Sequence, residues 1–247
     1  MNKKLIIGVD IGGSKINIIV WNGKEVIDNW RTEEVSLAKL KEGISYFDIL
    51  KLGIGVAGIL DHKTGRILNS PNLKFFEGLC FKKFLKKDVR FDNDVSCFLR
   101  AEAKLGVAKG YKNILAVVMG TGIGGAIIIN QKLIYQGSHG SAGEFGEMVL
   151  EGGKTWEKLY QASKGNDQKQ AQIHAFAFAN LINIFDPEII VLGGGGAKLP
   201  KRELMEKFII SPLAKKTKVV FGKFGSNAVA IGAALLFEDR SEATLRN

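Results

Sequence analysis

The sequence predicts an α/β fold organised as two related lobes. Segments with the pattern of buried strands alternate with segments of helical periodicity over most of the 247 residues. The N-terminal pattern of strand, glycine-rich turn and strand, LIIGVDIGGSKINIIVWNGK, also returns about a hundred residues later as NILAVVMGTGIGGAIIINQK. A repeat of this kind indicates an internal duplication, and therefore two lobes of similar design.

The first lobe is expected to begin with three strands connected by tight turns. Asn22-Gly23 lies between two of them, and this dipeptide between apolar runs is a strong hairpin signal. The last helix of the lobe is predicted from the 3.6-residue recurrence of its apolar side chains and from capping residues before it. In chain order, the predicted elements are strands over 5–10, 16–21 and 24–30, a helix over 35–47, strands over 48–58 and 65–72, a short helix over 82–87, a strand over 89–94 and a helix over 94–110.

The second lobe is expected to start from the repeated unit and to continue with alternating helices and strands. Its first two strands flank the glycine run at 119–125, and a short turn at Asn130-Gln131 leads to a third strand. The later predicted elements are a long helix over 169–185, a strand within 186–196, a helix over 200–210, a strand over 217–224 and a closing helix over 227–240.

Bulk composition indicates a soluble globular protein. The chain is 46% hydrophobic, which is enough for a full core at this length. Cys80 and Cys97 lack the spacing of a zinc or disulfide framework and suit a reducing compartment. The apolar run at the N-terminus meets Asp10 too early for a signal peptide, and no window is apolar enough for a membrane span. We therefore expect a cytoplasmic protein with no membrane partner.

The net charge of +10, from 35 Lys and Arg against 25 Asp and Glu, could attract nucleic acids, anionic membranes or phosphorylated small molecules. The basic residues are mostly scattered along the chain. In the densest cluster, KKFLKK at 82–87, Phe84 is the one aromatic residue. A solvated helix face explains this cluster better than a nucleic-acid patch, so no nucleic-acid partner is expected.

Two glycine-rich turns could bind phosphate. VDIGGSK at 9–15 presents backbone N–H groups, Ser14 and Lys15, and MGTGIGG at 119–125 adds the hydroxyl of Thr121. The first is neither a Walker A loop nor a dinucleotide fingerprint, because a strand follows it and the required spacing is absent. A plain hairpin turn is the alternative at each place. Two such turns in related lobes could hold one polyphosphate from both sides.

Three further segments have both a structural and a functional interpretation. Asp94, in FDNDV, lies between a strand and a helix, where a carboxylate could act as a general base or simply cap the helix. The glycine run VLGGGGAK at 191–198 could lie against a ring or ribose, or could be a flexible connection. The acids of GEFGEMVLEGGK at 143–154 could be solvated loop residues or could line a site.

These motifs in combination resemble the ROK (repressor, open reading frame, kinase) family of sugar kinases. The resemblance rests on VDIGGSK, GVAG with GRILNSPNL, FDNDV, AKGYKNILAVVMGTGIGGAII, GSHGSAGEFGEM, IIVLGGGG and AVAIGAALL, which occur in family order over nearly the whole chain. It implies the actin/hexokinase-like (ribonuclease H-like) duplicated two-lobe ATPase fold, with ATP and Mg²⁺ as cofactors. The implied activity is phosphorylation of a hexose hydroxyl, conversion of glucose to glucose 6-phosphate being the family's commonest reaction.

The resemblance also implies roles for individual residues. Asp94 corresponds to the general base that takes the proton from the sugar hydroxyl, and Asp10 to the partner of Mg²⁺ through water. The residues implied in sugar binding are Gly58, Asn93, Glu144, Glu147 and Glu157. Those implied in nucleotide binding are Asp10, Gly12, Gly13, Ser14 and Lys15 in the first phosphate loop, Thr121 and Gly122 in the second, and Gly194 and Gly195 in the later glycine run.

The sequence departs from the family where relatives bind zinc. The family's AGExGH motif ends in a histidine that contacts the sugar and often ligates zinc, and Glu147 occupies that position here. The family's cysteine cluster CxCGxxGC is also absent, and EGGKTW stands in its place. We therefore expect no zinc site and a shifted substrate preference. His139 and His174 match no family site and are expected to lie in a loop and on a helix.

Other functions stay open beside a glucose kinase. They are a kinase for fructose, mannose or an N-acetylhexosamine, an enzyme that uses polyphosphate as donor, a catalytically weak or silent sugar-binding sensor, and an ATPase of the same superfamily with a non-sugar substrate. A DNA-binding repressor is disfavoured, because the first lobe begins at residue 5 without a preceding helix-turn-helix.

The resemblance finally implies the arrangement of the lobes. The small lobe is expected to comprise 1–109 with 228–247 and to contain the first phosphate loop and Asp94. The large lobe is expected to comprise 110–227 and to contain the second phosphate loop and the nucleotide site. A sugar bound between the lobes, closure that excludes water, and a homodimer are expected from the relatives.

Overall fold

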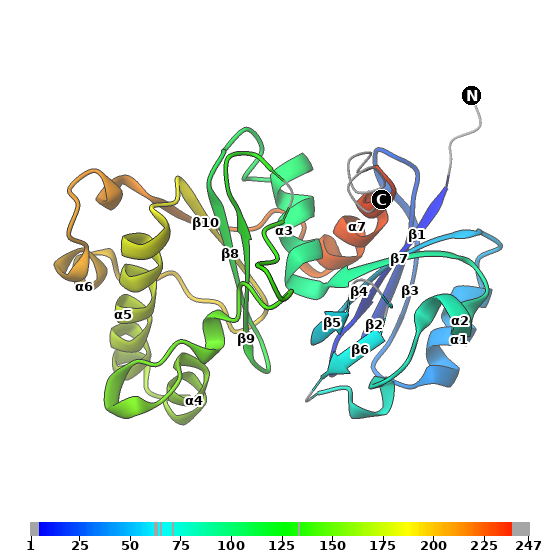
Figure 1. Cartoon of the computed structure of the whole chain (residues 1–247), viewed down its shortest axis with the longest axis horizontal. Coiled ribbons are helices and arrows are strands. Elements are labelled where there is room, and N and C mark those ends of the chain that lie inside the picture. The colour runs from blue at the N-terminus through cyan, green and yellow to red at the C-terminus, as the bar shows by residue number, and fades with distance from the viewer. Residues whose placement is uncertain (1–4, 62–63, 65, 71, 133, 239–247) are drawn as a thin grey trace. The chain divides into compact units, whose positions relative to one another are not determined.

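The computed structural model describes residues 5–61, 64, 66–70, 72–132 and 134–238, and the chain divides into two compact units (Figure 1). Unit 1 comprises the described residues of Met1–Ala101 and Phe224–Asn247, and unit 2 those of Glu102–Lys223. Unit 1 is thus built from two separate parts of the chain, and unit 2 from the segment between them. Both units combine strands and helices, which confirms the predicted α/β class.

Unit 1 contains a five-stranded sheet in the order β3-β2-β1-β4-β7. The first three strands form an antiparallel meander, because tight turns connect them, whereas β4 and β7 run parallel to β1 after crossover connections. β1 and β2 are buried throughout, as strands covered on both faces are. The strands are β1 (Ile6–Ile11), β2 (Ile16–Trp21), β3 (Val26–Thr32), β4 (Lys51–Val56) and β7 (Asp88–Asn93).

One face of this sheet is covered by α7 (Ala228–Ala234) and α3 (Asp94–Leu105). A Cβ on Gly8 or Gly53 would be 2.0 Å from a carbonyl oxygen of α7. A Cβ on Gly55 would be 3.3 Å from Cys97 of α3. No side chain fits at Gly8 and Gly53, so glycine there allows the backbone of α7 to pack directly on the strands.

The opposite face is covered by α1 (Leu37–Ser45) and α2 (Phe81–Leu85). Ser36 caps α1 by accepting the N–H of Lys39 at 3.2 Å. Leu40 from α1 and Phe81 from α2 belong to the main buried cluster of unit 1. A separate two-stranded sheet is formed by β5 (Ile59–Asp61) and β6 (Arg66–Asn69).

Unit 2 contains a four-stranded sheet in the order β11-β10-β8-β9. β8 and β9 are antiparallel, and β10 runs parallel to both β8 and β11. This arrangement repeats that of β7, β4, β1 and β2 in unit 1, as the internal duplication predicted. The strands are β8 (Ile114–Met119), β9 (Ile123–Ile128), β10 (Ile189–Gly193) and β11 (Lys218–Phe221).

Helices α4 (Trp156–Ala162), α5 (Asp167–Phe185) and α6 (Arg202–Met205) pack against this sheet. Trp156, Phe178 and Met205 from the three helices share one buried cluster with Leu115, Val117 and Leu192 of the strands. The long helix α5 lies beside the sheet in Figure 1. Among the described residues, no helix is long and apolar enough to cross a membrane.

Several elements differ from their predicted bounds. The helix predicted over 94–110 ends at Leu105, because Gly106 follows and the Glu102 carboxylate accepts the N–H of Val107 at 3.1 Å. The helix predicted over 200–210 is reduced to α6 and a 3-10 turn (Glu206–Phe208). In the part of the chain that the structure describes, the third strand predicted for the second repeat is represented by a bridge between Ile128 and Ile134. β5 and α4 were not predicted, and residues 239 and 240 of the closing helix lie outside the described residues.

Candidate functional site

The first glycine turn connects β1 to β2. Gly12 donates its N–H to the carbonyl of Lys15 at 3.0 Å, which closes the turn, and Gly13 and Ser14 at its tip are exposed. A Cβ on Gly13 would be 2.9 Å from the Cβ of Asn72, so a side chain here would force a shift. The turn presents backbone and one small hydroxyl side chain to solvent, which is what a phosphate-binding turn requires.

Asp10, near the end of β1, is buried, with an exposed fraction of 7%. Burial is the main cause that raises the pKa of Asp10 to about 7, and the negative charge of Asp94 acts in the same direction. Lys15 and Arg31 act in the opposite direction. A divalent cation near the two carboxylates would relieve their repulsion, so these residues fit the magnesium role expected of Asp10.

Asn93 and Asp94 lie where β7 leads directly into α3. The Oδ1 of Asn93 accepts the N–H groups of Val95 at 2.8 Å and of Ser96 at 3.3 Å, so Asn93 caps this helix. Its Nδ2 donates to the carbonyl of Gly58 at 3.1 Å, which brings two predicted sugar-binding residues together. Asp94 is the first residue of the helix, where the helix dipole favours its negative charge.

Gly58 has a backbone conformation that glycine adopts far more easily than other residues. Its φ is +124°, and a Cβ there would be 2.5 Å from the carbonyl oxygen of Asn69. The carbonyl group of Gly58 accepts the Asn93 side chain, so a larger residue at this position would disturb the hydrogen bond that orients Asn93.

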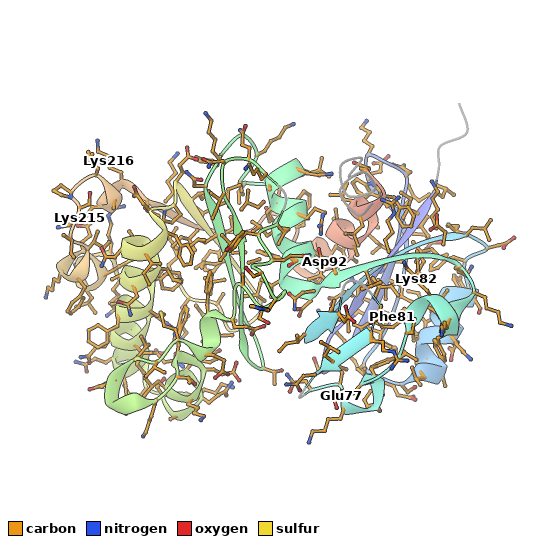
Figure 2. All side chains as sticks on the ribbon, in the orientation of Figure 1. Glu77, Phe81, Lys82, Asp92, Lys215 and Lys216 are labelled. Carbon is orange, nitrogen blue, oxygen red and sulfur yellow. The ribbon has the colours of Figure 1, made fainter. Side chains whose placement is uncertain are left out.

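A buried ion pair supports the junction between β7 and α3. Arg100 donates to Oδ2 of Asp92 at 2.9 Å, and each side chain is 3% exposed. The other oxygen of Asp92 accepts the N–H of Asn93 at 2.8 Å. Asp92 is labelled in Figure 2. The pairing of Asp92 with Arg100 could not be predicted from the sequence, because it depends on the angle between the strand and the helix in the folded chain.

The second glycine turn, between β8 and β9, is held by two side chains of α4. Glu157 accepts the N–H of Ile123 on its Oε2 at 2.7 Å, and Gln161 donates from Nε2 to the carbonyl of Thr121. The N–H groups of Thr121 and Gly122 have no acceptor in the part of the chain that the structure describes. These two donors are therefore available to an anion.

The glycine run after β10 packs against the end of β8. Gly196 donates its N–H to the carbonyl of Met119 at 3.0 Å. A Cβ on Gly194, whose φ is +86°, would be 2.1 Å from the same oxygen, whereas Gly195 has open space around its Cβ position. Met119 is the last residue of β8, so the structure brings the two predicted nucleotide segments of unit 2 together.

The predicted sugar-binding carboxylates of unit 2 also lie near one another. Glu144 precedes a 3-10 turn (Phe145–Glu147), and Glu157 lies in the first turn of α4. Desolvation, followed by the negative charges of Glu147 and Glu157, raises the pKa of Glu144. Glu157 has a hydrogen bond to the second glycine turn that the sequence did not indicate. Glu151 is an exposed loop acid.

Neither His174 nor His139 lies among the candidate site residues. His174 is buried in unit 2, where Trp156 donates from Nε1 to its Nδ1 at 3.2 Å, and burial is the main cause that lowers its pKa to about 4. His139 lies in an exposed loop. Among the described residues, no group of three His, Cys, Asp or Glu side chains is arranged to hold a metal ion.

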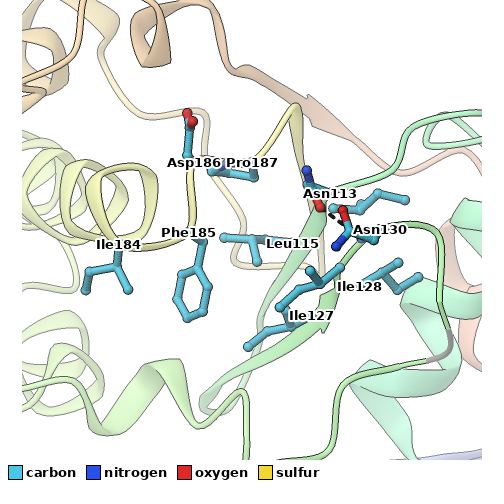
Figure 3. Close-up of a pocket in the computed structure, with 11 residues that line it drawn as sticks. Asn113, Leu115, Ile127, Ile128, Asn130, Ile184, Phe185, Asp186 and Pro187 are labelled. Carbon is cyan, nitrogen blue, oxygen red and sulfur yellow. Dashed lines mark hydrogen bonds between the residues drawn. The ribbon is translucent and has the colours of Figure 1, made fainter.

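A pocket of about 350 Å³ in unit 2 is separate from these residues (Figure 3). Apolar side chains such as Ile127, Ile184 and Phe185 line it. It also contains Asn113, whose Oδ1 accepts the N–H of Asn130 at 2.9 Å. No predicted site residue lines this pocket, so it is not part of the candidate site.

Two α/β units with a repeated strand order, each with a glycine turn after its first strand, define the actin/hexokinase-like class of proteins. The chain belongs to the ROK family, whose model matches residues 6–160 and 155–240. The motifs that carry the sequence resemblance therefore lie in a chain that matches the family almost from end to end.

Relatives and solved structures agree with this assignment. The chain is 26% identical over 306 residues to an N-acetyl-D-glucosamine kinase of Mannheimia succiniciproducens, with 94% of this chain and 99% of that protein covered. An N-acetyl-D-glucosamine kinase of Aliivibrio salmonicida is 28% identical over 301 residues, with 93% and 98% covered. The fold is similar to that of a ROK family glucokinase from Streptomyces griseus in complex with glucose and AMPPNP, with a TM-score of 0.78, 22% identity, and 94% and 98% of the two chains covered.

Proposed function

We propose that this chain is a sugar kinase that transfers the γ-phosphoryl group of ATP to a hydroxyl of a hexose or an N-acetylhexosamine. The observation that carries the proposal is the parallel pairing of β1 with β4 and of β4 with β7, which puts Asp10 and Asp94 at the same edge of the sheet. Phosphoryl transfer needs an oriented hydroxyl, a base beside it and neutralisation of phosphate charge. Unit 1 supplies a base candidate next to a phosphate turn.

Asp94 is proposed as the general base. Its place at the start of α3 favours the ionised form, which can accept the proton of a sugar hydroxyl. As that proton moves to Asp94, the hydroxyl oxygen bonds to the γ-phosphorus, and the bond from phosphorus to the bridging oxygen of ADP breaks. Asn93 and the ion pair of Asp92 with Arg100 keep the start of the helix in place during this step.

The phosphate groups are proposed to contact the glycine segments that the resemblance indicates. These are Gly12, Gly13, Ser14 and Lys15 in the first turn, Thr121 and Gly122 in the second, and Gly194 and Gly195 in the later run. Mg²⁺, held through water by Asp10, would supply the positive charge that the triphosphate requires. Backbone N–H groups at Thr121 and Gly122 would add hydrogen bonds to the phosphate oxygens.

The sugar-binding residues are proposed to be those that the resemblance implies, which are Gly58, Asn93, Glu144, Glu147 and Glu157. Carboxylates suit sugar hydroxyls because each oxygen accepts charge-assisted hydrogen bonds. The resemblance alone favoured glucose. The relatives named N-acetyl-D-glucosamine kinases align over nearly their full length, which makes N-acetylglucosamine the first sugar to test. A homodimer and a cytoplasmic location remain predictions.

A coupled assay for ADP, with ATP and Mg²⁺, tests the proposal on N-acetylglucosamine, N-acetylmannosamine, glucose, mannose and fructose. Turnover of at least one of these sugars is expected, and polyphosphate can replace ATP in a parallel series. Calorimetric binding of each sugar should be measured on the same preparation. A protein that binds a sugar with neither donor supporting turnover would be a sensor, and our proposal would be wrong.

Asp94→Asn tests the proposed base. This substitution should lower kcat by about 10²–10⁴-fold, because the amide cannot accept the proton, while sugar binding changes little. Asp88→Asn, on an exposed residue of the same β7 strand, is the matched control and should retain wild-type turnover. A kcat of Asp94→Asn within a few fold of wild type would exclude Asp94 as the base.

A further inference from the structure

Helix α4 holds the second glycine turn at two successive points. Glu157 and Gln161 are four residues apart and therefore lie on the same side of the helix. Glu157 binds the N–H of Ile123, and Gln161 binds the carbonyl of Thr121. Glu157 thus accepts a hydrogen bond from the residue after Gly122, and Gln161 donates one to the residue before it.

The bond from Gln161 determines where the neighbouring amide points. A trans peptide is planar, and its C=O and N–H groups point in opposite directions. The peptide between Thr121 and Gly122 has its carbonyl directed to Gln161. The N–H of Gly122 is therefore directed away from α4, and it has no acceptor among the described residues. Glycine at 122 has no Cβ and cannot by itself hold the peptide in this orientation.

The helix that carries Gln161 is itself held firmly. Thr155 accepts the N–H of Lys158 at 3.4 Å and caps its first turn. Trp156 is fully buried and donates to His174 on α5 at 3.2 Å. Tyr160 reaches the glycine run after β10, where a Cβ on Gly196 would be 2.2 Å from its hydroxyl. α4 thus contacts both glycine segments of unit 2.

We propose that Gln161 is a positioning residue for the phosphoryl donor. Its hydrogen bond to Thr121 directs the N–H of Gly122 toward a phosphate oxygen of the donor. The proposal rests on the proposed function, because it assigns the second turn to the phosphates of the nucleotide. Gln161 touches neither substrate. It acts on nucleotide affinity and on the orientation of the donor, and it has no effect on the sugar.

Gln161→Met tests this role, because methionine has a similar length and cannot donate to Thr121. The expected result is a rise of about tenfold in the KM for ATP and in the Kd of a non-hydrolysable ATP analogue, the size expected for loss of one hydrogen bond. The Kd of the sugar should stay within about twofold of wild type. Lys158→Met, on the exposed side of the same helix, is the matched control and should change neither constant.

Gln161→Glu separates positioning from a purely structural role. An ionised carboxylate cannot donate to Thr121 and would face its carbonyl oxygen. At pH 8 the analogue should therefore bind more weakly to Gln161→Glu than to Gln161→Met. A protonated carboxyl group can donate, so affinity should recover as pH falls toward 5, whereas Gln161→Met should show no such recovery. A purely structural role would lower the thermal unfolding midpoint of the two variants and would weaken sugar and nucleotide binding alike.

The outcomes distinguish this proposal from the proposed function. Sugar turnover by the wild type together with an unchanged nucleotide KM in Gln161→Met would overturn the role of Gln161 alone. Nucleotide binding without sugar turnover would remove the proposed function, while the analogue Kd values would still decide the role of Gln161. A wild-type protein that binds no ATP analogue would overturn both.

Discussion

Arg100 and Asp92 place two opposite charges in the interior of unit 1, next to the proposed general base. Removing each charge from water costs several kcal/mol, and mutual attraction offsets that cost only when both partners are present. Such a pair adds little net stability. Asp92 also accepts the N–H of Asn93, so the ion pair helps to fix the backbone where β7 leads into α3, at Asn93 and Asp94.

Arg100→Met should destabilise the protein by about 3–5 kcal/mol, because the carboxylate of Asp92 would stay buried without the opposite charge of Arg100. Urea unfolding followed by circular dichroism measures the free energy of unfolding. Lys198→Met is the control, since it removes the cation of an exposed pair with Asp167 and should cost less than about 1 kcal/mol. Equal losses in the two variants would contradict this interpretation.

Glu147 adds a negative charge beside Glu144. This charge, after desolvation, raises the pKa of Glu144, so Glu144 becomes protonated at a higher pH than an isolated glutamate. A protonated Glu144 loses part of its capacity to accept hydrogen bonds from sugar hydroxyls. Glu147 therefore restricts how far into the acid range the proposed sugar site works.

Glu147→Gln should shift the acid side of the pH profile of kcat/KM to lower pH. The neutral amide removes one cause of the raised pKa of Glu144, so that carboxylate stays ionised further into the acid range. Glu151→Gln, in the exposed part of the same loop, should leave the profile unchanged. A shift to higher pH, or the same shift in both variants, would argue against the coupling of Glu147 to Glu144.

Most residues of the proposed site could be named from the sequence because each lies in a short motif of unusual composition. Asp10 precedes a glycine pair, and Asp94 follows Asn93 between a strand and a helix. The hydrogen bond from Ile123 to Glu157 could not be predicted, because it joins residues 34 positions apart and depends on how α4 packs. Sequence motifs indicate which residues can do chemistry, and packing decides which of them contact one another.

At the scale of elements, α4 is the helix that the sequence patterns did not reveal. It has seven residues, too few for apolar periodicity to distinguish a helix from a loop. Thr155 was an available signal, because threonine before an apolar run is a common helix cap. The helices and strands with long or repeated apolar patterns, such as α5 and the first two strands of each repeat, were predicted within a few residues.

Gly53→Ala should destabilise unit 1 by about 3 kcal/mol, because the new Cβ would be 2.0 Å from the carbonyl oxygen of Ala233 and would push α7 from the sheet. Thermal unfolding by calorimetry would show the loss as a lower midpoint. Gly110→Ala is a useful comparison, because Gly110 has open space around its Cβ position but a φ of +91°. This substitution should lower the free energy of unfolding by about 1 kcal/mol through backbone strain alone. A midpoint of Gly53→Ala equal to wild type would show that α7 can move without loss.

At the scale of the whole molecule, the duplication was visible because both copies keep a glycine turn between two apolar strands. The copies have diverged beyond this core. Among the described residues, the counterpart of β3 is a bridge at Ile134. The chain was predicted to pass from the small lobe to the large lobe after residue 109 and to return after residue 227. The boundaries between the two compact units follow Ala101 and Lys223. The first of these points lies inside α3, where no sequence pattern marks a change.

Limited proteolysis of ribosome-bound chains arrested at increasing lengths should show unit 2 becoming protected before unit 1. Unit 2 is one continuous segment, whereas the sheet of unit 1 needs α7 from beyond residue 223. Chains with residues up to 223 outside the ribosome should therefore resist cleavage in unit 2 and be cut in β1–β4. Protection of unit 1 at that length would show that its sheet is stable without α7.

The glycines at 8 and 53 thus have a consequence for biosynthesis. Domains of most proteins fold during translation in the order in which they are made. Here the strands of the first unit are made early, but the helix that fits against those glycines is made after the whole of unit 2. The unit that carries the proposed base, Asp94, is completed last, so a chain interrupted before residue 228 lacks the helix that completes that unit.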